Sequence, residues 1–252
     1  MEKTELYETI FKRKSIRNYD LTPLNQNTLN EISSHIQSLT PLYDDIEVDL
    51  KIISTEDVKR RFMKKAPHYI AAFSEEKEGY LTNIGFMLQQ MDLFLSANGI
   101  GTCWQGIPKP TNEILESSRQ EFIILIAFGR PAEPLYRSST LEFKRKSLQE
   151  ISDVEGAEEI MEAARFAPST GNYQPWFFTG NENMIHAYSI KPSIIRGVLA
   201  GRFIPIDIGI AFYHLKLAAE HFGRKTEVLM DNDIVRDYSK KGYNYIASLK
   251  LE

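Results

Sequence analysis

The sequence predicts a mixed fold of helices and strands that is built from two similar halves, residues 1–152 and 153–252. Three observations lead to this prediction. The chain has 252 residues, of which 42% are hydrophobic and 25% charged, an ordinary composition for a soluble protein with a sizeable core. Helical and strand-like patterns alternate along the chain. After Ile151 the order of these patterns starts again.

The first half is expected to begin with two helices and two strands. Apolar residues at helical spacing predict a helix over residues 4–12 and a second helix after Pro23. Weak alternation predicts a strand over residues 48–54. A second strand is predicted over residues 69–73, bounded by Pro67 and by a charged stretch.

A long helix over residues 83–97 is predicted next. Its sequence is apolar nearly all round, so we expect it to be buried. Asn98-Gly99 is typical of a helix C-terminus. The apolar run over residues 122–128 predicts a buried strand, which Gly129 stops.

The second half repeats this order in a degenerate form. We predict helices over residues 157–166 and 206–222, and strands over residues 176–179 and 243–251.

Two four-residue segments give the clearest match between the halves. Asn83-Ile84-Gly85-Phe86 opens the first long helix, and Asp207-Ile208-Gly209-Ile210 opens the second. Two such helices are expected to pack on each other across a pseudo-two-fold axis. The alternative is that two buried helices resemble each other only because both are apolar.

Charge and cysteine content exclude several classes of protein. The formal net charge of −4 argues against a nucleic-acid partner, because binding a phosphate backbone needs a basic field. Cys103 is the only cysteine, so neither an intrachain disulfide nor a Cys-rich metal site is expected. The start of the sequence is polar and acidic, unlike a signal peptide, and the longest apolar run is too short for a bilayer. We therefore expect a cytoplasmic protein without a membrane role.

A short basic segment, Arg13-Lys14-Ser15-Ile16-Arg17, is the first candidate site. If the segment is extended, Arg13, Ser15 and Arg17 lie on one face. Two guanidinium groups and a hydroxyl on one face suit a phosphate that carries a polar tail. The alternative is a solvated surface segment, since short basic runs are common on protein surfaces.

A polar loop between two prolines, Pro168 and Pro175, is the second candidate site. Its Ser, Thr, Asn and Gln side chains can offer hydrogen bonds to the edge of a planar heterocycle. Local capping and turn formation would explain Ser169 and Asn172 equally well.

These segments resemble the motifs of the nitroreductase family. The stretch Arg-Lys-Ser-Ile-Arg-Asn-Tyr from Arg13 is similar to the motif that opens its sequences, and residues 163–176 are similar to its Pro-Ser-Ser-x-Asn-x-Gln-Pro-Trp loop. Residues 97–104 resemble its Gly-x-Gly-x-x-Trp segment. Residues 128–131, followed by 145–150, resemble its closing strand and basic tail. The resemblance covers most of the chain in family order.

The resemblance implies an α+β fold of three layers, with mostly antiparallel central sheets flanked by helices. In the family, two subunits pair through their long helices and hold FMN at their interface. Arg13, Lys14 and Ser15 would then meet the phosphate and ribityl chain, and Arg17 would approach the N1 and O2 edge of the flavin.

The same resemblance implies further FMN-binding residues. Arg145 would close on the phosphate. Gly101 matches the backbone close under the flavin ring, where a side chain would clash. The loop that covers the ring from the partner subunit is matched by Pro168, Ser169, Thr170 and Asn172.

The two motifs are divided between the halves. The first half has the basic segment, but residues 38–43, Ser-Leu-Thr-Pro-Leu-Tyr, stand where the Pro-Ser-Ser loop is expected. The second half has that loop, but residues 152–156, Ser-Asp-Val-Glu-Gly, stand where the basic segment is expected. One copy of each motif predicts a fused, monomeric pseudo-dimer with one FMN site, although a homodimer stays open.

The predicted function is FMN-dependent transfer of a hydride from NADH or NADPH to a small electron-poor acceptor, a nitroaromatic or a quinone, by a ping-pong mechanism. Arg17 is the predicted catalytic residue, because a fixed cation near N1 favours the reduced flavin. Two alternatives stay open. One is other flavin chemistry, such as reductive dehalogenation or flavin breakdown. The other is FMN binding for storage or sensing, which the altered region Leu39–Asp45 and the loss of one site favour.

Several other residues are expected to be structural, and no metal is required. The glycines near Trp104 do not fit a dinucleotide-binding pattern, because the tryptophan takes the place of the third glycine. His214 and His221 show no close metal spacing and are expected in the core or at the surface. Cys103 is expected to be an inert buried thiol.

Overall fold

The computed structural model describes residues 3–59, 65–190, 201–229 and 242–252, and the chain divides into two compact units. Unit 1 consists of Met1–Phe11, Leu81–Gln89 and Leu141–Glu252, and unit 2 consists of Lys12–Tyr80 and Gln90–Thr140. Neither unit is one continuous stretch of chain. The boundary between residues 152 and 153 concerns the sequence repeat, and it stays a prediction.

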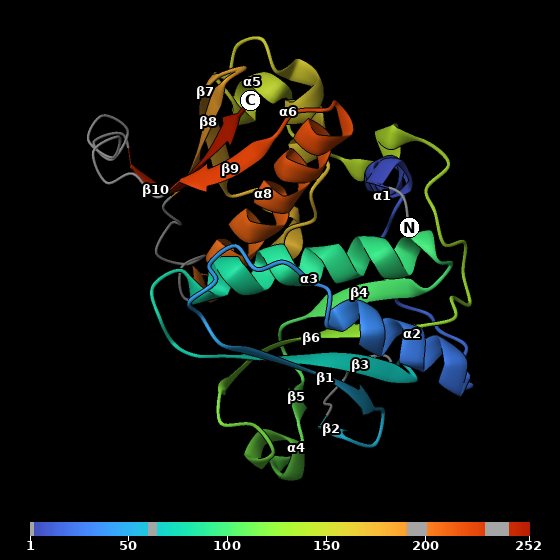
Figure 1. Ribbon diagram of the computed structural model, residues 1–252. Helices are drawn as coiled ribbons and strands as arrows, with labels where there is room; N and C mark the ends of the chain where they lie inside the picture. The colour runs from blue at the N-terminus through green and yellow to red at the C-terminus, as the bar shows by residue number, and fades with distance from the viewer. Residues whose placement is uncertain (1–2, 60–64, 191–200, 230–241) are drawn as a thin grey trace. The chain divides into compact units, whose positions relative to one another are not determined.

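Unit 2 is built on a four-stranded antiparallel sheet in the order β1-β3-β6-β4 (Figure 1). The strands are β1 (Val48–Ser54), β3 (His68–Ser74), β4 (Gly101–Gln105) and β6 (Glu121–Gly129). Every residue of β3 is buried, and so are the last seven of β6. Both strands therefore have nearly continuous apolar sequences where an exposed strand would alternate.

The remaining elements of unit 2 are short. Helix α2 (Gln26–Ile36) begins at the N-cap Asn25, whose side-chain oxygen accepts a hydrogen bond from the Thr28 N–H at 2.9 Å. Two two-residue strands pair with each other, and helix α4 follows them in the chain. These elements are β2 (Val58–Lys59), β5 (Lys109–Pro110) and α4 (Asn112–Glu116).

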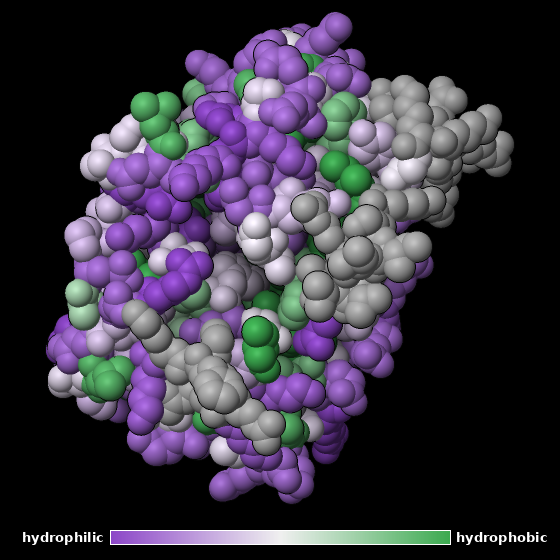
Figure 2. Space-filling view, turned by 180° about the vertical axis from the view of Figure 1, so that it is seen from behind, coloured by the Kyte–Doolittle hydropathy of each residue, from purple (hydrophilic) through white to green (hydrophobic). Residues whose placement is uncertain are grey.

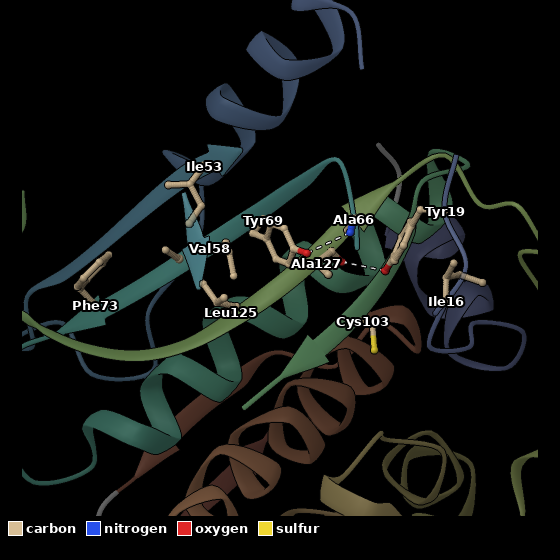
Figure 3. Packing of buried hydrophobic residues seen from close by; sticks show 11 residues of the cluster. Ile16, Tyr19, Ile53, Val58, Ala66, Tyr69, Phe73, Cys103, Leu125 and Ala127 are labelled. Carbon is tan, nitrogen blue, oxygen red and sulfur yellow. Dashed lines mark hydrogen bonds between the residues drawn. The ribbon is translucent and has the colours of Figure 1, made fainter. Parts of the chain in front are cut away.

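The core of unit 2 contains two tyrosines whose hydroxyls are hydrogen-bonded (Figure 3). The Tyr19 hydroxyl donates to the carbonyl oxygen of Ala127 at 3.3 Å, and the Tyr69 hydroxyl accepts from the Ala66 N–H at 3.0 Å. Both rings can therefore lie among apolar side chains without an unsatisfied polar end. Ile16 is fully buried in the same core, so the core anchors the segment that carries the first candidate site.

Unit 1 contains a second four-stranded antiparallel sheet, in the order β7-β8-β10-β9 (Figure 1). Its strands are β7 (Trp176–Asn181), β8 (Met184–Ile190), β9 (Thr226–Leu229) and β10 (Tyr243–Leu251). Unit 1 also contains residues Leu81–Gln89 of helix α3 (Tyr80–Ala97) and the helices α1 (Lys3–Ile10), α5 (Leu148–Ile151), α6 (Glu158–Arg165) and α8 (Ile204–His221). Short 3₁₀ turns are η1 (Thr140–Phe143), η2 (Thr170–Asn172) and η3 (Gly201–Phe203).

The two sheets share one topology. Counted along the chain, the strands of each sheet lie in the order first, second, fourth, third, and all neighbours are antiparallel. A helix precedes each sheet, α2 or α6, and an 18-residue helix, α3 (Tyr80–Ala97) or α8, joins the second and third strands. The α+β fold class and its internal repeat are therefore confirmed.

Helices α3 and α8 approach each other closely within unit 1. A Cβ atom at Gly85 would meet the carbonyl oxygen of Ile206, and one at Gly209 would meet the carbonyl oxygen of Thr82. Ile206 lies three residues before Gly209, and Thr82 lies three residues before Gly85. The two contacts are thus reciprocal, as in an isologous interface, and only glycine permits backbones this close. The expected packing of the two long helices is confirmed.

Most predicted elements lie within a few residues of their expected bounds. The strand over residues 48–54 has the predicted bounds, whereas the helix expected from residue 83 begins at Tyr80. The sequence pattern does not predict β4, β8 or β9. Their short, mixed sequences lack a clear period of two, and pairing with a neighbouring strand defines them instead.

The surface carries few large apolar side chains. Figure 2 shows a face on which hydrophilic residues predominate and hydrophobic residues occur in small groups. Among the described residues, the exposed large apolar side chains are Leu21, Ile107, Leu141 and Phe222, which are far apart in the sequence. Within the described ranges, no helix combines the length and apolar character that a membrane crossing requires.

Candidate functional site

The basic segment of unit 2 is extended, as the first candidate site requires. Ser15 forms a parallel bridge with Thr102 of β4, and the Ile16 N–H donates to the Thr102 carbonyl oxygen at 2.8 Å. On the other side, Tyr19 forms an antiparallel bridge with Pro131. The segment therefore extends the sheet beyond β4, and backbone hydrogen bonds fix its register.

Arg13 lies in the core of unit 2 and is paired with a buried carboxylate. Its side chain is 2% exposed, and its Nε lies 3.1 Å from Oδ2 of Asp92, which is fully buried. The other carboxylate oxygen of Asp92 accepts a hydrogen bond from the Thr102 hydroxyl. Arg13 Nη2 lies 3.5 Å from the Ser15 hydroxyl, to which it donates. The guanidinium is thus ion-paired with Asp92, while another of its nitrogens faces the predicted phosphate ligand Ser15.

Lys14 and Arg17 have more exposed positions. Lys14 Nζ lies 3.5 Å from Oε2 of Glu133. The other oxygen of Glu133 accepts hydrogen bonds from the backbone N–H groups of Arg17 (2.9 Å) and Asn18 (3.0 Å). The bond from the Arg17 backbone is the main cause that lowers the pKa of Glu133 below its usual value. The Arg17 side chain is exposed and forms no ion pair with any residue that the structure describes.

Gly101 has a structural reason to be glycine. A Cβ atom here would lie 2.7–2.9 Å from three atoms of the Ile16 side chain. Gly101 thus allows the basic segment to pack against the start of β4. The clash with a flavin ring that the resemblance implies stays a prediction.

The polar loop of unit 1 is closed by its own hydrogen bonds. The Gln174 N–H donates to the Ser169 hydroxyl at 2.9 Å, and Gln174 Oε1 accepts from the Lys146 N–H at 2.8 Å. Asn172 and Gln174 both have positive φ, 58° and 52°. The Asn172 side chain also donates to the Lys144 carbonyl oxygen at 2.9 Å, so local hydrogen bonds account for both Ser169 and Asn172, and their role at FMN stays a prediction.

Arg145 contacts this loop. It donates from Nη1 to Asn172 Oδ1 and to the Phe143 carbonyl oxygen (3.1 Å), and from Nη2 to the Phe166 carbonyl oxygen (3.1 Å). The structure thus brings Arg145 and Asn172 together, and their roles at FMN stay predictions.

A buried aspartate of α8, Asp207, holds the same loop. Its carboxylate accepts from the Thr170 N–H at 3.0 and 3.1 Å and from the Thr170 hydroxyl at 3.2 Å. Burial raises the pKa of Asp207 to about 7, although the two Thr170 hydrogen bonds act in the opposite direction.

The predicted site residues fall into two groups. Unit 2 holds Arg13, Lys14, Ser15, Arg17 and Gly101, and unit 1 holds Arg145, Pro168, Ser169, Thr170 and Asn172. Sequence reasoning did not find Asp92, Glu133, Gln174 or Asp207 as partners of these residues. A usable signal existed for Asp92, which is the only charged residue in α3, because charge in an apolar helix needs a partner.

The residues expected to be structural have structural contacts. His214 is fully buried, with Nδ1 2.9 Å from the Ala163 carbonyl oxygen and Nε2 3.0 Å from Gln89 Nε2. Burial raises the pKa of the Cys103 thiol, which disfavours the reactive thiolate. In the described part of the chain, no cluster of three or more His, Cys, Asp or Glu residues could hold a metal ion.

Comparison with known proteins gives a family. The family model described as "Putative TM nitroreductase" matches residues 5–219. A search of curated proteins finds no match.

A solved structure supports the same fold, and two others are similar over about half of this chain. A Thermotoga maritima protein described as a "putative nitroreductase" is similar over 100% of this chain and 94% of its own, with 22% identity and a TM-score of 0.65. A nitroreductase family protein of Clostridium difficile 630 is similar over 57% of this chain and 94% of its own (17% identity, TM-score 0.46). A protein of Clostridium difficile R20291, described as an FMN-dependent nitroreductase, is similar over 54% of this chain and 96% of its own (13%, 0.43).

Proposed function

The chain belongs to the nitroreductase family, and we propose that it is an FMN-dependent oxidoreductase. In this proposal it passes a hydride from NADH or NADPH to a small electron-poor acceptor, a nitroaromatic or a quinone. The observation that carries the proposal is the extended basic segment of unit 2. Arg13 in that segment is neutralised by Asp92, whereas Arg17 is exposed and free of ion pairs among the described residues.

The donor chemistry of this segment fits FMN. A phosphate needs cations and hydroxyl or N–H donors at one place, and a flavin needs donors along its polar edge. Lys14 and Ser15 are partly exposed, and the buried Arg13 donates from Nη2 to the Ser15 hydroxyl, so a cation and a hydroxyl backed by a second cation lie on one segment. Glu133 balances part of this charge without covering Arg17.

We assign the remaining contacts as follows. Arg13, Lys14 and Ser15 bind the phosphate and the ribityl chain, and Arg17 binds the polar edge of the flavin. For unit 1, the family resemblance assigns Arg145 to the phosphate and the loop of Pro168, Ser169, Thr170 and Asn172 to the ring. Bonds within this loop and to Asp207 of α8 hold it in place.

When bound, FMN supplies the centre that accepts and then donates the hydride. The chain's own contribution is position and charge. Arg17, as a fixed cation near the polar edge, favours the extra negative charge that two-electron reduction places there. The donor and the acceptor bind in turn, which gives ping-pong kinetics, and the reaction requires no protein nucleophile.

The distribution of motifs supports one FMN for each chain, with the chain acting as a monomer. The basic segment occurs once, in unit 2. Its counterpart ahead of α6, residues 152–156, carries Asp153 and Glu155 and has no cation. A segment with this charge repels a phosphate.

A flavin spectrum, the FMN stoichiometry and an anaerobic titration with NADH and with NADPH test the proposal. We expect a yellow protein with one FMN for each chain that either nucleotide bleaches and a quinone or nitroaromatic reoxidises. Two FMN for each chain would contradict the single site. A colourless protein that does not take up added FMN would contradict the function.

FMN binding without turnover is a second candidate, and one observation favours it. In the first half, the region that stands in place of the flavin-covering loop is held against α3 by Gln90, whose amide oxygen accepts from the Thr40 N–H and whose amide nitrogen donates to the Thr40 carbonyl oxygen. This region is therefore built into the fold of unit 2. Bound FMN that neither NADH nor NADPH reduces would favour this candidate.

A further inference from the structure

The two long helices carry opposite charges at matched positions. The reciprocal contacts of Gly85 and Gly209 align α3 with α8. Asp92 lies seven residues after Gly85, and Lys216 lies seven residues after Gly209. The helix of the first half thus has an acid where the helix of the second half has a base.

Each of these charged residues bonds a matched threonine. Thr102 at the start of β4 and Thr226 at the start of β9 lie 17 residues after Gly85 and Gly209. The Thr102 hydroxyl donates to Asp92, whereas the Thr226 hydroxyl accepts from Lys216 Nζ at 3.2 Å. The same bridge between helix and strand occurs in both halves, with the direction of the hydrogen bond reversed.

The remaining partners follow the charge. Asp92 pairs with Arg13 of the basic segment, and both side chains are at least 98% buried. Lys216 pairs with Glu220, which also binds Lys3 at 2.8 Å. An arginine placed beside Lys216, as Arg13 is placed beside Asp92, would face a like charge.

We propose that Asp92 is the positioning residue for the FMN phosphate, and that Lys216 at the matched place prevents the second half from holding an equivalent basic segment. This inference rests on the proposed function. Asp92 acts through Arg13: its carboxylate forms an ion pair with Nε at 3.1 Å, and in that position Nη2 of the same guanidinium donates to the Ser15 hydroxyl. The charge at this position of each long helix thus favours one FMN over two, together with the acidic segment at residues 152–156.

The physical basis is the cost of burying a cation. A guanidinium that is 2% exposed needs a counter-charge, and a phosphate bound from solvent supplies one only in the complex. Asp92 supplies it permanently, so the arginine is already placed before the ligand arrives. Such preorganisation raises affinity because little order remains to be imposed on binding.

Asp92→Asn tests the role, with FMN and riboflavin as a matched pair of ligands. The two differ only in the phosphate, so a positioning role predicts a loss that is specific to FMN. We expect the Kd of FMN to rise about tenfold or more and that of riboflavin to change less than about twofold. Titrations of the full chain by flavin fluorescence, below the unfolding temperature of each variant, give both constants.

Two further variants control for a general effect on folding and test whether Asp92 acts through Arg13. Lys216→Gln alters the matched bridge and should leave the ratio of the two Kd values within about twofold of wild type. Arg13→Gln should match Asp92→Asn, and the double variant should be no worse than either, because both act through one group. If Asp92→Asn does not fold, Thr102→Val takes its place. That variant removes one hydrogen bond to the carboxylate, so the FMN-specific loss should be about threefold.

The outcomes separate this inference from the proposed function. If the wild-type chain binds neither FMN nor riboflavin, both are overturned. If wild type binds FMN but Asp92→Asn weakens the two ligands equally, or weakens neither, only the role of Asp92 is overturned. An FMN-specific loss that Arg13→Gln reproduces supports it.

Discussion

The sheet of unit 2 and the sheet of unit 1 have the same strand order, the same antiparallel pairing and an 18-residue helix at the same place in the chain. They differ in the charged residues attached to that frame. The first carries the Arg13 segment and Asp92, and the second carries Lys216 and the loop at Ser169–Asn172. The frame depends on buried apolar faces and backbone hydrogen bonds, so a few polar positions can change without altering it.

The loops that precede the two sheets show the same principle. In unit 2, the N–H and hydroxyl of Thr40 both bond Gln90 Oε1, at 3.1 and 3.2 Å. In unit 1, the N–H and hydroxyl of Thr170 both bond Asp207 Oδ1, at 3.0 and 3.2 Å. The geometry is alike, but an amide holds one loop and a carboxylate the other. Only the carboxylate of Asp207 can change its charge with pH.

The largest expected effect concerns what the two halves share. Gly85→Ala and Gly209→Ala each place a Cβ against a backbone carbonyl oxygen of the other long helix. We expect each to lower the free energy of unfolding by more than about 4 kcal/mol, because backbone cannot move aside as a side chain can. Denaturant unfolding measures this, with Gly201→Ala as control, since a Cβ there meets nothing within 4 Å. Equal tolerance of alanine at all three positions would contradict the reciprocal contact.

The next effect is a pH dependence of stability, which is expected from the loop held by Asp207 and not from the loop held by Gln90. The pKa of Asp207 is raised from 3.8 to about 7 in the folded protein, so the folded state holds a proton that the unfolded state loses between these values. Stability from this group is therefore fully present below about pH 4 and declines as the pH rises to about 7. The decline should be on the order of 4 kcal/mol.

Asp207→Asn keeps an acceptor for Thr170 and removes the titration, which makes this loop like the one held by Gln90. The difference in unfolding free energy between wild type and variant should fall as pH rises through that range and then level off. A difference that stays constant from pH 4.5 to 8 would show that Asp207 does not titrate in this range.

A smaller effect concerns Arg17, a cation of the basic segment that the second half lacks. Arg17→Ala should lower the rate of flavin reduction by NADH or NADPH tenfold to a hundredfold, on the order expected for removing one charge-stabilising donor. FMN should stay bound, because Arg13, Lys14 and Ser15 are intact. Anaerobic stopped-flow reduction measures the rate, with the exposed Arg119→Ala as control. Unchanged reduction by the Arg17 variant would remove its catalytic role.

The smallest effect is the loss of the exposed ion pair beside Lys216, which contrasts with the loss of the buried pair at the matched position. Lys3 is 65% exposed and binds Glu220 beside Lys216, so Lys3→Ala should cost less than about 1 kcal/mol and less still in high salt. The buried pair of Arg13 and Asp92 should cost about 3–5 kcal/mol when one partner is removed. Thermal unfolding in low and high salt distinguishes the two, and equal costs would mean that burial does not separate these pairs.

Much of the fold could be predicted from the sequence because apolar periodicity is local. The strand at residues 48–54, the long buried helices and the repeat of Gly85 and Gly209 all follow from patterns within one segment. The strands β4 and β9 could not, since each is defined by its partner strand. The compact units also depend on contacts between distant segments. Each unit therefore combines several stretches of the chain, and no single boundary in the sequence separates them.

For the candidate site, the sequence by itself determined which residue types are present and in which half: one basic segment, one polar loop, and hence a single proposed FMN. Only the tertiary structure decided how those residues are used. It placed Asp92 in an ion pair with Arg13, which is 79 residues away in the chain. It also placed Asp207 in hydrogen bonds with Thr170, which is 37 residues away. Contacts over such separations leave no periodic trace in the sequence, because a hydrogen bond or ion pair depends on distance in space and not on spacing along the chain.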